Sequence, residues 1–390
     1  MTRATDLMTT DPLNTVHSNT VHSDTVRIDD VDVPALWLRD ACPCAGCRHT
    51  GSGQRLHSVL ALDPGTTVAD VHIDGDDVDI TFVPDHTARF SLAWLRHHAP
   101  GRARVFDDRS ERSRRPWVAD DLPNGVPTVA WSDLYRGAGG GGGGGRRLGA
   151  LRDLTDLGVL LVRDVPVVHG SVLDVARSIG FVRTTNYGDL FDVRVEPQPI
   201  NLAYTGRAIA PHTDNPYREP VPGVQLLHCL SSSADGGENV LLDGFSVAAV
   251  LRREDSAAFA TLTHTRLTFR YDDDRTALRA SGPAIELNAD GDVRGIRWND
   301  RSIEPPQVPL HEVNEVYRAL RAFAAVLVRP ELHLHLTLAP GDCVVFDNTR
   351  ILHARTAFTD GAGARHLQGC YADLDGLASA RAVLERTARG

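Results

Sequence analysis

The chain has 390 residues, of which 42% are hydrophobic and 24% charged, and its formal net charge at pH 7 is −10. This length and composition are typical of a soluble protein with room for two domains, one of them with a large core. The negative charge argues against a nucleic-acid partner, and the complete absence of lysine excludes a Schiff-base enzyme. We find neither a secretory leader nor an apolar run of the ~20 residues that a membrane span needs, so we expect a cytoplasmic protein without a membrane partner.

The first 100 residues divide into a tail and a small domain. Residues 1–25 are rich in Thr, Ser, Asp and Asn, too polar to offset the cost of ordering, and we expect a disordered tail. Residues 26–100 contain short alternating runs typical of a small β domain. Val68–His72 and Val78–Val83 are its predicted strands, separated by the turn at Asp74-Gly75-Asp76.

Three of the six cysteines, Cys42, Cys44 and Cys47, lie within six residues of one another. A disulfide scaffold would spread its cysteines along the chain, whereas Zn²⁺ binds clustered thiolates in a closed tetrahedral site. The cluster therefore predicts a structural zinc site, with three reduced cysteines in a tight loop as the alternative. Spacing alone leaves the fourth ligand open among six histidines: His49, His57, His72, His86, His97 and His98.

Residues 101–147 are charged, then proline-containing, and end in a run of glycines from Gly137 to Gly145. We interpret them as a linker with a flexible loop. The glycine run is not a phosphate-binding loop, because no Gly-Lys-Ser/Thr follows it.

From residue 148 to residue 390 the patterns predict a mixed α and β domain. The predicted helices are Leu148–Leu157, Ser171–Ile179 with Ser171 as its cap, and His311–Val328. The predicted strands are Gly158–Val162, Val221–Cys229, Glu238–Leu242, Thr263–Tyr271, Ala284–Asn288, Arg294–Trp298 and His333–Leu336. We expect His333 and His335 to face solvent, and Cys229, Cys343 and Cys370 to be buried without a chemical role.

The chemistry is predicted at His212, Asp214 and His353. Side chains two apart in an extended segment leave the same face, so His212 and Asp214 can bind one ion. Two imidazoles and one carboxylate form the facial triad of non-haem Fe(II) oxygenases, and Arg365, twelve residues after His353, suits a dicarboxylate cosubstrate. The same His-x-Asp spacing recurs at His22/Asp24 and His72/Asp74, which we interpret as part of the tail and a polar strand edge.

Four motifs carry a family resemblance. Asn201–Thr205, Pro211–Asp214, Pro222–Cys229 and Arg365–Asp373 resemble, in this order, the γ-butyrobetaine dioxygenase and trimethyllysine dioxygenase branch of the Fe(II)/2-oxoglutarate oxygenases, a TauD-like superfamily. The resemblance implies an α+β fold: a double-stranded β-helix (jelly roll) catalytic domain preceded by a small zinc domain. It also implies that His86, in the context Pro84-Asp85-His86, is the fourth zinc ligand.

The resemblance further implies an enzyme that uses Fe(II), 2-oxoglutarate and O₂, with ascorbate added in assays. His212, Asp214 and His353 would bind the iron, and Arg365 the 2-oxoglutarate. The family tends to be dimeric, so a homodimer is expected.

Substrate residues also follow from the resemblance. An aromatic cage for a trimethylammonium group would comprise Tyr187, Phe191, Tyr204 and Tyr371, with Phe191 standing where the family has tryptophan. Asn201 and Asn299 would contact the anionic end of the substrate. The predicted reaction is hydroxylation of γ-butyrobetaine to L-carnitine. The alternatives are trimethyllysine or a phosphonate analogue as substrate, a non-catalytic binding module, and a zinc module that acts by binding proteins.

Overall fold

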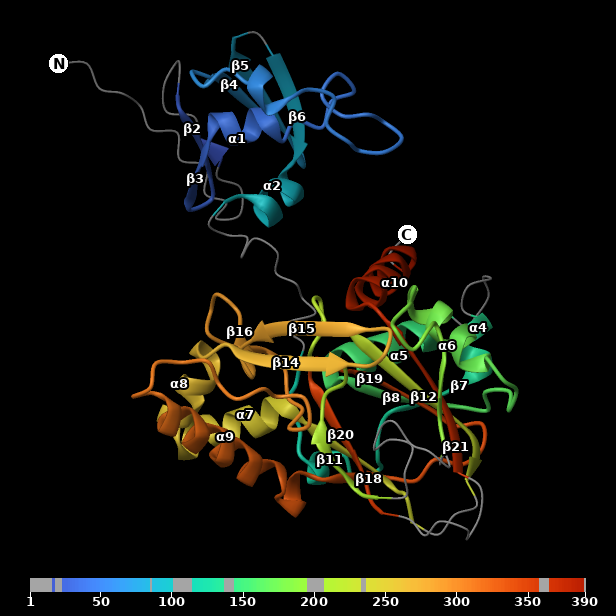
Figure 1. Cartoon of the computed structure of the whole chain (residues 1–390). Coiled ribbons are helices and arrows are strands. Elements are labelled where there is room, and N and C mark those ends of the chain that lie inside the picture. Colours follow the sequence, from blue (N-terminus) through green and yellow to red (C-terminus); the bar gives the residue numbers. More distant parts are fainter. Residues whose placement is uncertain are drawn as a thin grey trace, which may run out of the picture. The chain divides into compact units, whose positions relative to one another are not determined.

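The computed structural model describes residues 23–84, 86–100, 114–136, 144–194, 207–232, 236–357 and 365–388, together with the backbone of a short strand at residues 16–17. The chain divides into two compact units, residues 1–109 and 110–390, which are described separately (Figure 1). The predicted tail lies largely outside the described residues. We expected disorder throughout the tail, but it contains a short strand, β1 (Val16–His17), which pairs with β2 (Thr25–Ile28).

The N-terminal unit is a small β domain, as predicted. β2 and β3 (Val31–Pro34) form a hairpin that leads into α1 (Ala35–Asp40), and η1 (Val59–Ala61) follows. β4 (Thr67–Asp74), β5 (Asp77–Val83) and β6 (His86–Ser91) form an antiparallel meander that ends in α2 (Leu92–His98). Every second side chain of β5 is buried in the core of this unit, so the alternation in the sequence sets the register.

The C-terminal unit is built on two facing sheets. The larger has the order β10-β21-β12-β19-β8-β7, with β9 also paired to β21, and the smaller has the order β11-β20-β13-β18. Their strands are β7 (Thr128–Ala130), β8 (Val159–Arg163), β9 (Val182–Arg183), β10 (Phe191–Val193), β11 (Ile209–His212), β12 (Val224–Ser232), β13 (Asn239–Asp243), β18 (Leu334–Leu336), β19 (Cys343–Asp347), β20 (Ile351–Arg355) and β21 (Arg365–Ala372). From β11 to β21 the chain passes repeatedly between the two sheets, and all pairs except β7 with β8 are antiparallel. This topology confirms the double-stranded β-helix.

Helices support both sheets (Figure 1). α5 (Gly144–Leu157), α6 (Ser171–Ile179) and α10 (Leu374–Thr387) pack with the larger sheet around one apolar core. α7 (Gly244–Glu254), α8 (Ser256–His264) and α9 (Val313–Leu327) share a second core with the smaller sheet. Two hairpins lie between α8 and α9: β14 (Leu267–Asp272) with β15 (Ala277–Gly282), and β16 (Ile285–Leu287) with β17 (Val293–Ile296).

The prediction of a linker at residues 101–147 is wrong for residues 114–136. η2 (Ala119–Asp121), β7 and α4 (Trp131–Arg136) lie there, and Trp117 and Leu134 are buried, because these apolar side chains pack on the core of the C-terminal unit. Helix α5 starts at Gly144 and so takes in the end of the glycine run. Residues 101–113 and 137–143 lie outside the described residues.

Two local predictions also need correction. Gly170, with φ of 89°, is the cap of α6 in place of Ser171, because this left-handed backbone favours glycine. His335 is exposed as predicted. His333 is half-buried instead, and its Nε2 lies 2.8 Å from the carbonyl oxygen of Leu327. The burial of Cys229, Cys343 and Cys370 is confirmed.

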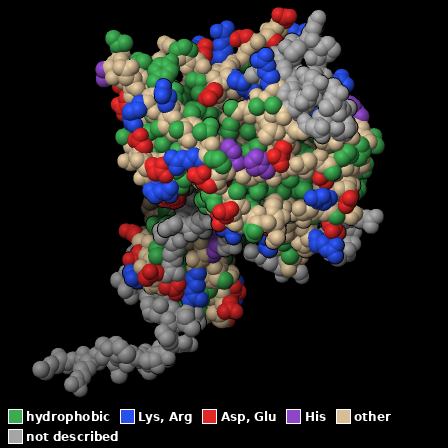
Figure 2. Space-filling view, turned by 90° about the horizontal axis from the view of Figure 1, so that it is seen from below, with side chains coloured by type: hydrophobic (Ala, Val, Ile, Leu, Met, Phe, Trp, Pro, Cys, Tyr) green, Lys and Arg blue, Asp and Glu red, His purple; other side chains and the backbone are tan. Residues whose placement is uncertain are grey.

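On the face drawn in Figure 2, arginine and carboxylate side chains are interspersed, and this face carries no continuous basic patch. Among the described residues, no helix combines the length and the apolar character that crossing a membrane requires.

A fully buried ion pair joins distant parts of the C-terminal unit. Arg350 donates from Nε and Nη2 to the two carboxylate oxygens of Asp243 at 3.0 and 2.8 Å, and both side chains are 0% exposed. Its guanidinium also donates to the carbonyl oxygens of Asp156 and Arg115 at 2.9 and 2.7 Å. One side chain therefore ties residues before β8 to the segment between β19 and β20.

Replacing Arg350 by methionine leaves a buried carboxylate without its cation. We expect Arg350→Met to lower the free energy of unfolding by about 3–5 kcal/mol, measured by urea titration. The control is Arg279→Met, since the side chain of Arg279 is 62% exposed where it pairs with Glu304, and its loss should cost no more than about 1 kcal/mol. Equal stability of the two variants would contradict the role of Arg350.

Candidate active site

His212, Asp214 and His353 converge at the end of β11 in the smaller sheet. His212 ends β11 and is the register partner of His353 on the neighbouring strand β20, while Asp214 follows β11. Nε2 of His212 lies 3.3 Å and Nε2 of His353 lies 3.9 Å from Oδ1 of Asp214. One atom from each residue lies within 4.8 Å of the others, a separation at which a single metal ion can be bound.

Hydrogen bonds orient two of these side chains. Nδ1 of His212 lies 2.9 Å from the carbonyl oxygen of Ala210, so this nitrogen carries the proton and Nε2 keeps its lone pair. Oδ2 of Asp214 accepts hydrogen bonds from Nε2 of Gln225 and from the hydroxyl of Tyr371, each at 2.8 Å. Oδ1 of Asp214 is thereby left to face the two imidazoles.

Asn348, five residues before His353, fixes the backbone of Asp214. Its Oδ1 accepts from the N–H of Asp214 at 2.7 Å, and its Nδ2 donates to the carbonyl oxygens of Asp214 and Pro222 at 3.0 and 2.9 Å. Sequence reasoning missed this role, although Asn348 lies inside the motif that leads to His353.

The charge states suit a divalent cation. Burial, reinforced by the neighbouring His212, lowers the pKa of His353 to about 3, so this imidazole is neutral at pH 7. Burial alone would raise the pKa of Asp214, but the adjacent imidazoles of His212 and His353 and the hydrogen bond from Tyr371 outweigh it and hold that pKa below its usual range. A neutral imidazole at His353, a second imidazole at His212 and an ionised carboxylate at Asp214 are a ligand set that fits Fe(II).

The triad opens into a cavity of about 450 Å³ between the two sheets and the β14–β15 hairpin. Arg365, the first residue of β21, lines this cavity and is only 8% exposed. Its Nη2 donates to Oδ1 of Asn239 at 3.2 Å, and burial lowers the pKa of its guanidinium. An arginine in such a wall can bind a carboxylate through two donors.

An aromatic wall leads away from Asp214. The ring of Tyr371 stacks on Phe191 at 5.2 Å between centroids, and Phe191 lies 6.1 Å from Tyr187. Tyr271 continues the wall, 5.9 Å from Tyr187 and 5.1 Å from Tyr217. Such a row of rings can bind a quaternary ammonium cation, which has no proton to donate.

Gly369 makes room for the central ring of this wall. It is the register partner of Phe191 on β21, and a Cβ at residue 369 would lie 2.4 Å from Cζ of Phe191. The phenyl ring therefore lies directly on the backbone of β21.

The structure brings together most of the predicted site. Tyr187, Phe191, Asn299 and Tyr371 all line the cavity that holds the triad and Arg365. Asn201 and Tyr204 lie outside the described residues. Sequence reasoning missed several lining residues: Asn215, Tyr217, Gln225, Asn239, Arg270, Tyr271, Asp272, Arg301 and Arg355. Tyr217 follows Asp214 by three residues and could have been found, whereas only the fold brings in the β14 residues.

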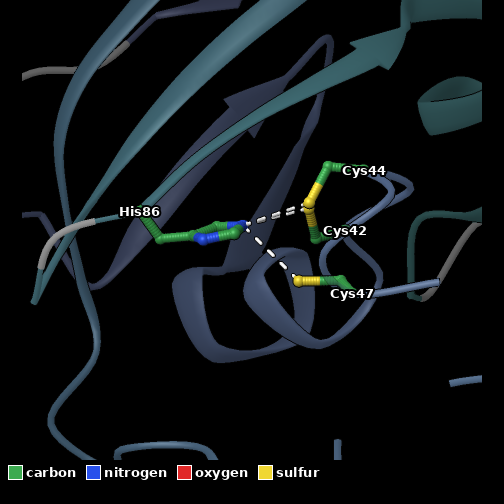
Figure 3. Close-up of side chains that lie close together, drawn as sticks. All are labelled: Cys42, Cys44, Cys47 and His86. Carbon is green, nitrogen blue, oxygen red and sulfur yellow. Dashed lines mark hydrogen bonds between the residues drawn. The ribbon is translucent and has the colours of Figure 1, made fainter. Parts of the chain in front are cut away.

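The second cluster lies in the N-terminal unit (Figure 3). Nε2 of His86, at the start of β6, lies 3.1, 3.9 and 3.6 Å from the sulfur atoms of Cys42, Cys44 and Cys47 in the loop after α1. Of the six histidines that spacing left open, His86 is the one that joins the three cysteines among the described residues. Three thiols and one imidazole match the ligands of structural zinc sites. Burial by itself raises the pKa of the Cys42 thiol to about 12, so a cation is needed to stabilise its thiolate.

Comparison with known proteins assigns the class. Residues 146–371, more than half of the chain, match the taurine catabolism dioxygenase TauD, TfdA family, and residues 23–96 match the gamma-butyrobetaine hydroxylase-like N-terminal domain. The chain belongs to this dioxygenase family, and the predicted 2-oxoglutarate-dependent oxygenase is confirmed.

Among the relatives, the chain is 34% identical to the gamma-butyrobetaine dioxygenase of Pseudomonas sp. (strain AK-1), over 90% of each chain. It is 29% identical to the gamma-butyrobetaine dioxygenase of Homo sapiens, over 90% of this chain and 91% of the relative. It is 26% identical to the trimethyllysine dioxygenase of Meyerozyma guilliermondii, over 88% of each.

Proposed function

We propose that the protein hydroxylates γ-butyrobetaine to L-carnitine with Fe(II), 2-oxoglutarate and O₂. The observation that carries the proposal is the aromatic wall directly beside the His212–Asp214–His353 triad. The similarity to gamma-butyrobetaine dioxygenases along nearly the whole chain supports it.

His212, Asp214 and His353 would hold the iron, and Arg365 would pair with the distal carboxylate of 2-oxoglutarate. When bound, iron with 2-oxoglutarate and O₂ supplies an oxidant that replaces a substrate C–H bond by C–OH. The remaining work belongs to the protein. Gln225 and Tyr371 keep the carboxylate of Asp214 in place through its second oxygen.

The aromatic wall would orient the substrate. Tyr187, Phe191 and Tyr371 present ring faces to a trimethylammonium group and exclude water around it. Phenylalanine attracts a cation less strongly than tryptophan does. Tyr271 and Tyr217 add ring surface that the sequence did not predict, and we expect them to compensate for Phe191. Asn201 and Tyr204 remain predicted substrate residues.

Trimethyllysine is the second candidate, because trimethyllysine dioxygenases are also relatives. The N-terminal unit would contribute a structural zinc site of Cys42, Cys44, Cys47 and His86. This zinc would stabilise the fold of the unit and take no part in the oxidation. A purely non-catalytic module is disfavoured by the intact triad.

Succinate release from 2-oxoglutarate tests the proposal, with γ-butyrobetaine, trimethyllysine or no amine added to the Fe(II)-loaded protein in ascorbate. We expect γ-butyrobetaine to stimulate release most strongly, and a His212→Ala protein to give only the blank. Stronger stimulation by trimethyllysine would reassign the substrate. No consumption of 2-oxoglutarate would reject the enzyme.

A further inference from the structure

A chain of hydroxyl hydrogen bonds joins the aromatic wall to the residue that follows Asp214. The hydroxyl oxygens of Tyr187 and Tyr217 lie 3.1 Å apart, and the hydroxyl of Tyr217 donates to Oδ1 of Asn215 at 2.7 Å. Tyr217 has a single hydroxyl proton and gives it to Asn215, so the hydrogen bond between the two tyrosines is donated by Tyr187. We call the chain Tyr187–Tyr217–Asn215 the hydroxyl relay.

One end of the hydroxyl relay is anchored beside the triad. Asn215 is 3% exposed and has a φ of 53°, a left-handed conformation that asparagine adopts more readily than most residues other than glycine. The backbone N–H and carbonyl oxygen of the preceding Asp214 are both held by Asn348, at 2.7 and 3.0 Å. Asn215 is therefore fixed relative to the backbone of a triad residue.

The other end of the relay lies in a tight turn. Tyr187 lies between Thr185 and Gly188, whose backbone N–H and C=O groups bond to each other at 3.1 and 3.0 Å, so the turn is closed on itself. A second contact runs beside the relay, because Nη2 of Arg218 donates to Oδ1 of Asn186. Two neighbouring side-chain hydrogen bonds thus tie this turn to the segment after β11.

Tyr217, the central member of the relay, has separate contacts for its ring and its hydroxyl. It is 7% exposed, and its ring stacks on Tyr271 at 5.1 Å between centroids. Burial raises the pKa of Tyr217, so its hydroxyl keeps the proton that it donates. Removal of the hydroxyl oxygen alone therefore breaks the relay and leaves the ring in the wall.

We propose that Tyr217 and Asn215 are positioning residues that fix the ring of Tyr187 at a set distance from Asp214 and so select the substrate carbon that faces the metal. This inference rests on the proposed function and goes beyond it, because it assigns the choice of carbon to hydroxyl groups that hold the wall in place. Neighbouring carbons of an alkyl chain lie ~1.5 Å apart, so a shift of the bound ammonium group by that length presents a different C–H bond.

The test compares wild type with two variants that break the relay. Tyr217→Phe keeps the ring and removes the hydroxyl, and Asn215→Gly accommodates the left-handed backbone and removes the acceptor. The matched control is Tyr317→Phe, because Tyr317 is an exposed tyrosine of α9 outside the cavity wall. With Fe(II), 2-oxoglutarate, ascorbate and γ-butyrobetaine, wild type and control should form succinate and hydroxylated amine in equal amounts.

Tyr217→Phe should misplace the substrate without releasing it. We expect kcat for the hydroxylated amine to fall about 10- to 100-fold, as for a misplacement near 1 Å, and succinate to exceed that product at least about twofold. Part of the product should carry its hydroxyl on a neighbouring carbon, as resolved by chromatography. The Kd of γ-butyrobetaine, measured by calorimetry with Mn(II) and 2-oxoglutarate, should change less than about threefold because the rings remain.

Two further readouts distinguish a relay from separate structural roles. Tyr217 and Asn215 share one hydrogen bond, so the double variant should lose no more than about twofold beyond the worse single variant. The chain has seven tyrosines, so the hydroxyl-bearing ring carbon of each can be followed by ¹³C NMR in the iron-free protein. The signal of Tyr187 should shift in Tyr217→Phe and stay in place in Tyr317→Phe.

The outcomes separate the two proposals. Wild type that forms no hydroxylated amine would reject the proposed function and this inference with it. Wild type that hydroxylates the amine, together with full coupling and a single product in Tyr217→Phe, would overturn the inference alone. Additive losses in the double variant, an unshifted Tyr187 signal, or a Kd that rises as much as kcat falls would also overturn it, the last because Tyr217 would then act in binding.

Discussion

A His353→Ala protein is expected to lose iron binding and substrate-stimulated succinate release. Its activity should fall by more than the ~10–100-fold that is typical when a residue supporting a metal ligand is removed. The reason is geometric: removal of this imidazole leaves His212 and Asp214, and two protein ligands no longer hold three positions around the metal. Iron binding is measured by equilibrium dialysis under anaerobic conditions, and activity by succinate release.

Removal of a residue that only holds an iron ligand in place should lower activity less than removal of the ligand itself. Asn348→Ala removes the side chain that holds the backbone of Asp214 and should cost about 10–100-fold while some iron binding remains. His335→Ala is the control, because His335 is an exposed histidine on β18, the edge strand of the same sheet, where it pairs with Glu238. Substantial activity in His353→Ala, or equal losses in all three variants, would contradict the assignment of the triad.

Removal of zinc is expected to unfold the N-terminal unit. We predict about one zinc per purified chain, lost in Cys42→Ser and on treatment with a strong chelator. Binding of structural zinc contributes an apparent ~10–16 kcal/mol in small zinc domains, so a unit with so small a core should not stay folded without it. Zinc is measured by atomic spectrometry, and unfolding by limited proteolysis within residues 23–100.

The control for zinc is Cys343→Ala, which removes a buried thiol from the larger sheet of the catalytic unit and should leave the zinc content unchanged. A purified wild-type protein without zinc, or a Cys42→Ser unit as resistant to protease as wild type, would refute the zinc site.

Much of the fold was predictable because its signals are local. The alternating runs around Asp74-Gly75-Asp76 predicted β4 and β5, and the apolar periodicity after His311 predicted α9. Residues 114–136 were missed because the short apolar runs around Trp117 and Leu134 are interrupted by prolines and charged residues, and only packing on the catalytic core buries these side chains. The cap of α6 depends on the backbone conformation of Gly170, which the pattern Ser171-x-x-Asp174 did not reveal.

In the active site, too, residues that lie in sequence motifs could be predicted, and residues that only the fold brings to the cavity could not. Motif residues such as His212, Asp214 and His353 could be named in advance, and the β11–β20 register is what places the two histidines side by side. Tyr271 and Arg301 could not be named, because neither carries a motif and each reaches the cavity only through the fold. A homodimer, a cytoplasmic location and a phosphonate substrate stay predictions.

The most direct test of the central claim is the stoichiometry of one reaction. Wild-type protein with Fe(II), 2-oxoglutarate, O₂ and γ-butyrobetaine should form succinate and a product one oxygen atom heavier than γ-butyrobetaine in equal amounts, measured together by mass spectrometry. Succinate without the hydroxylated product, or no response to γ-butyrobetaine in iron-loaded protein, would contradict it.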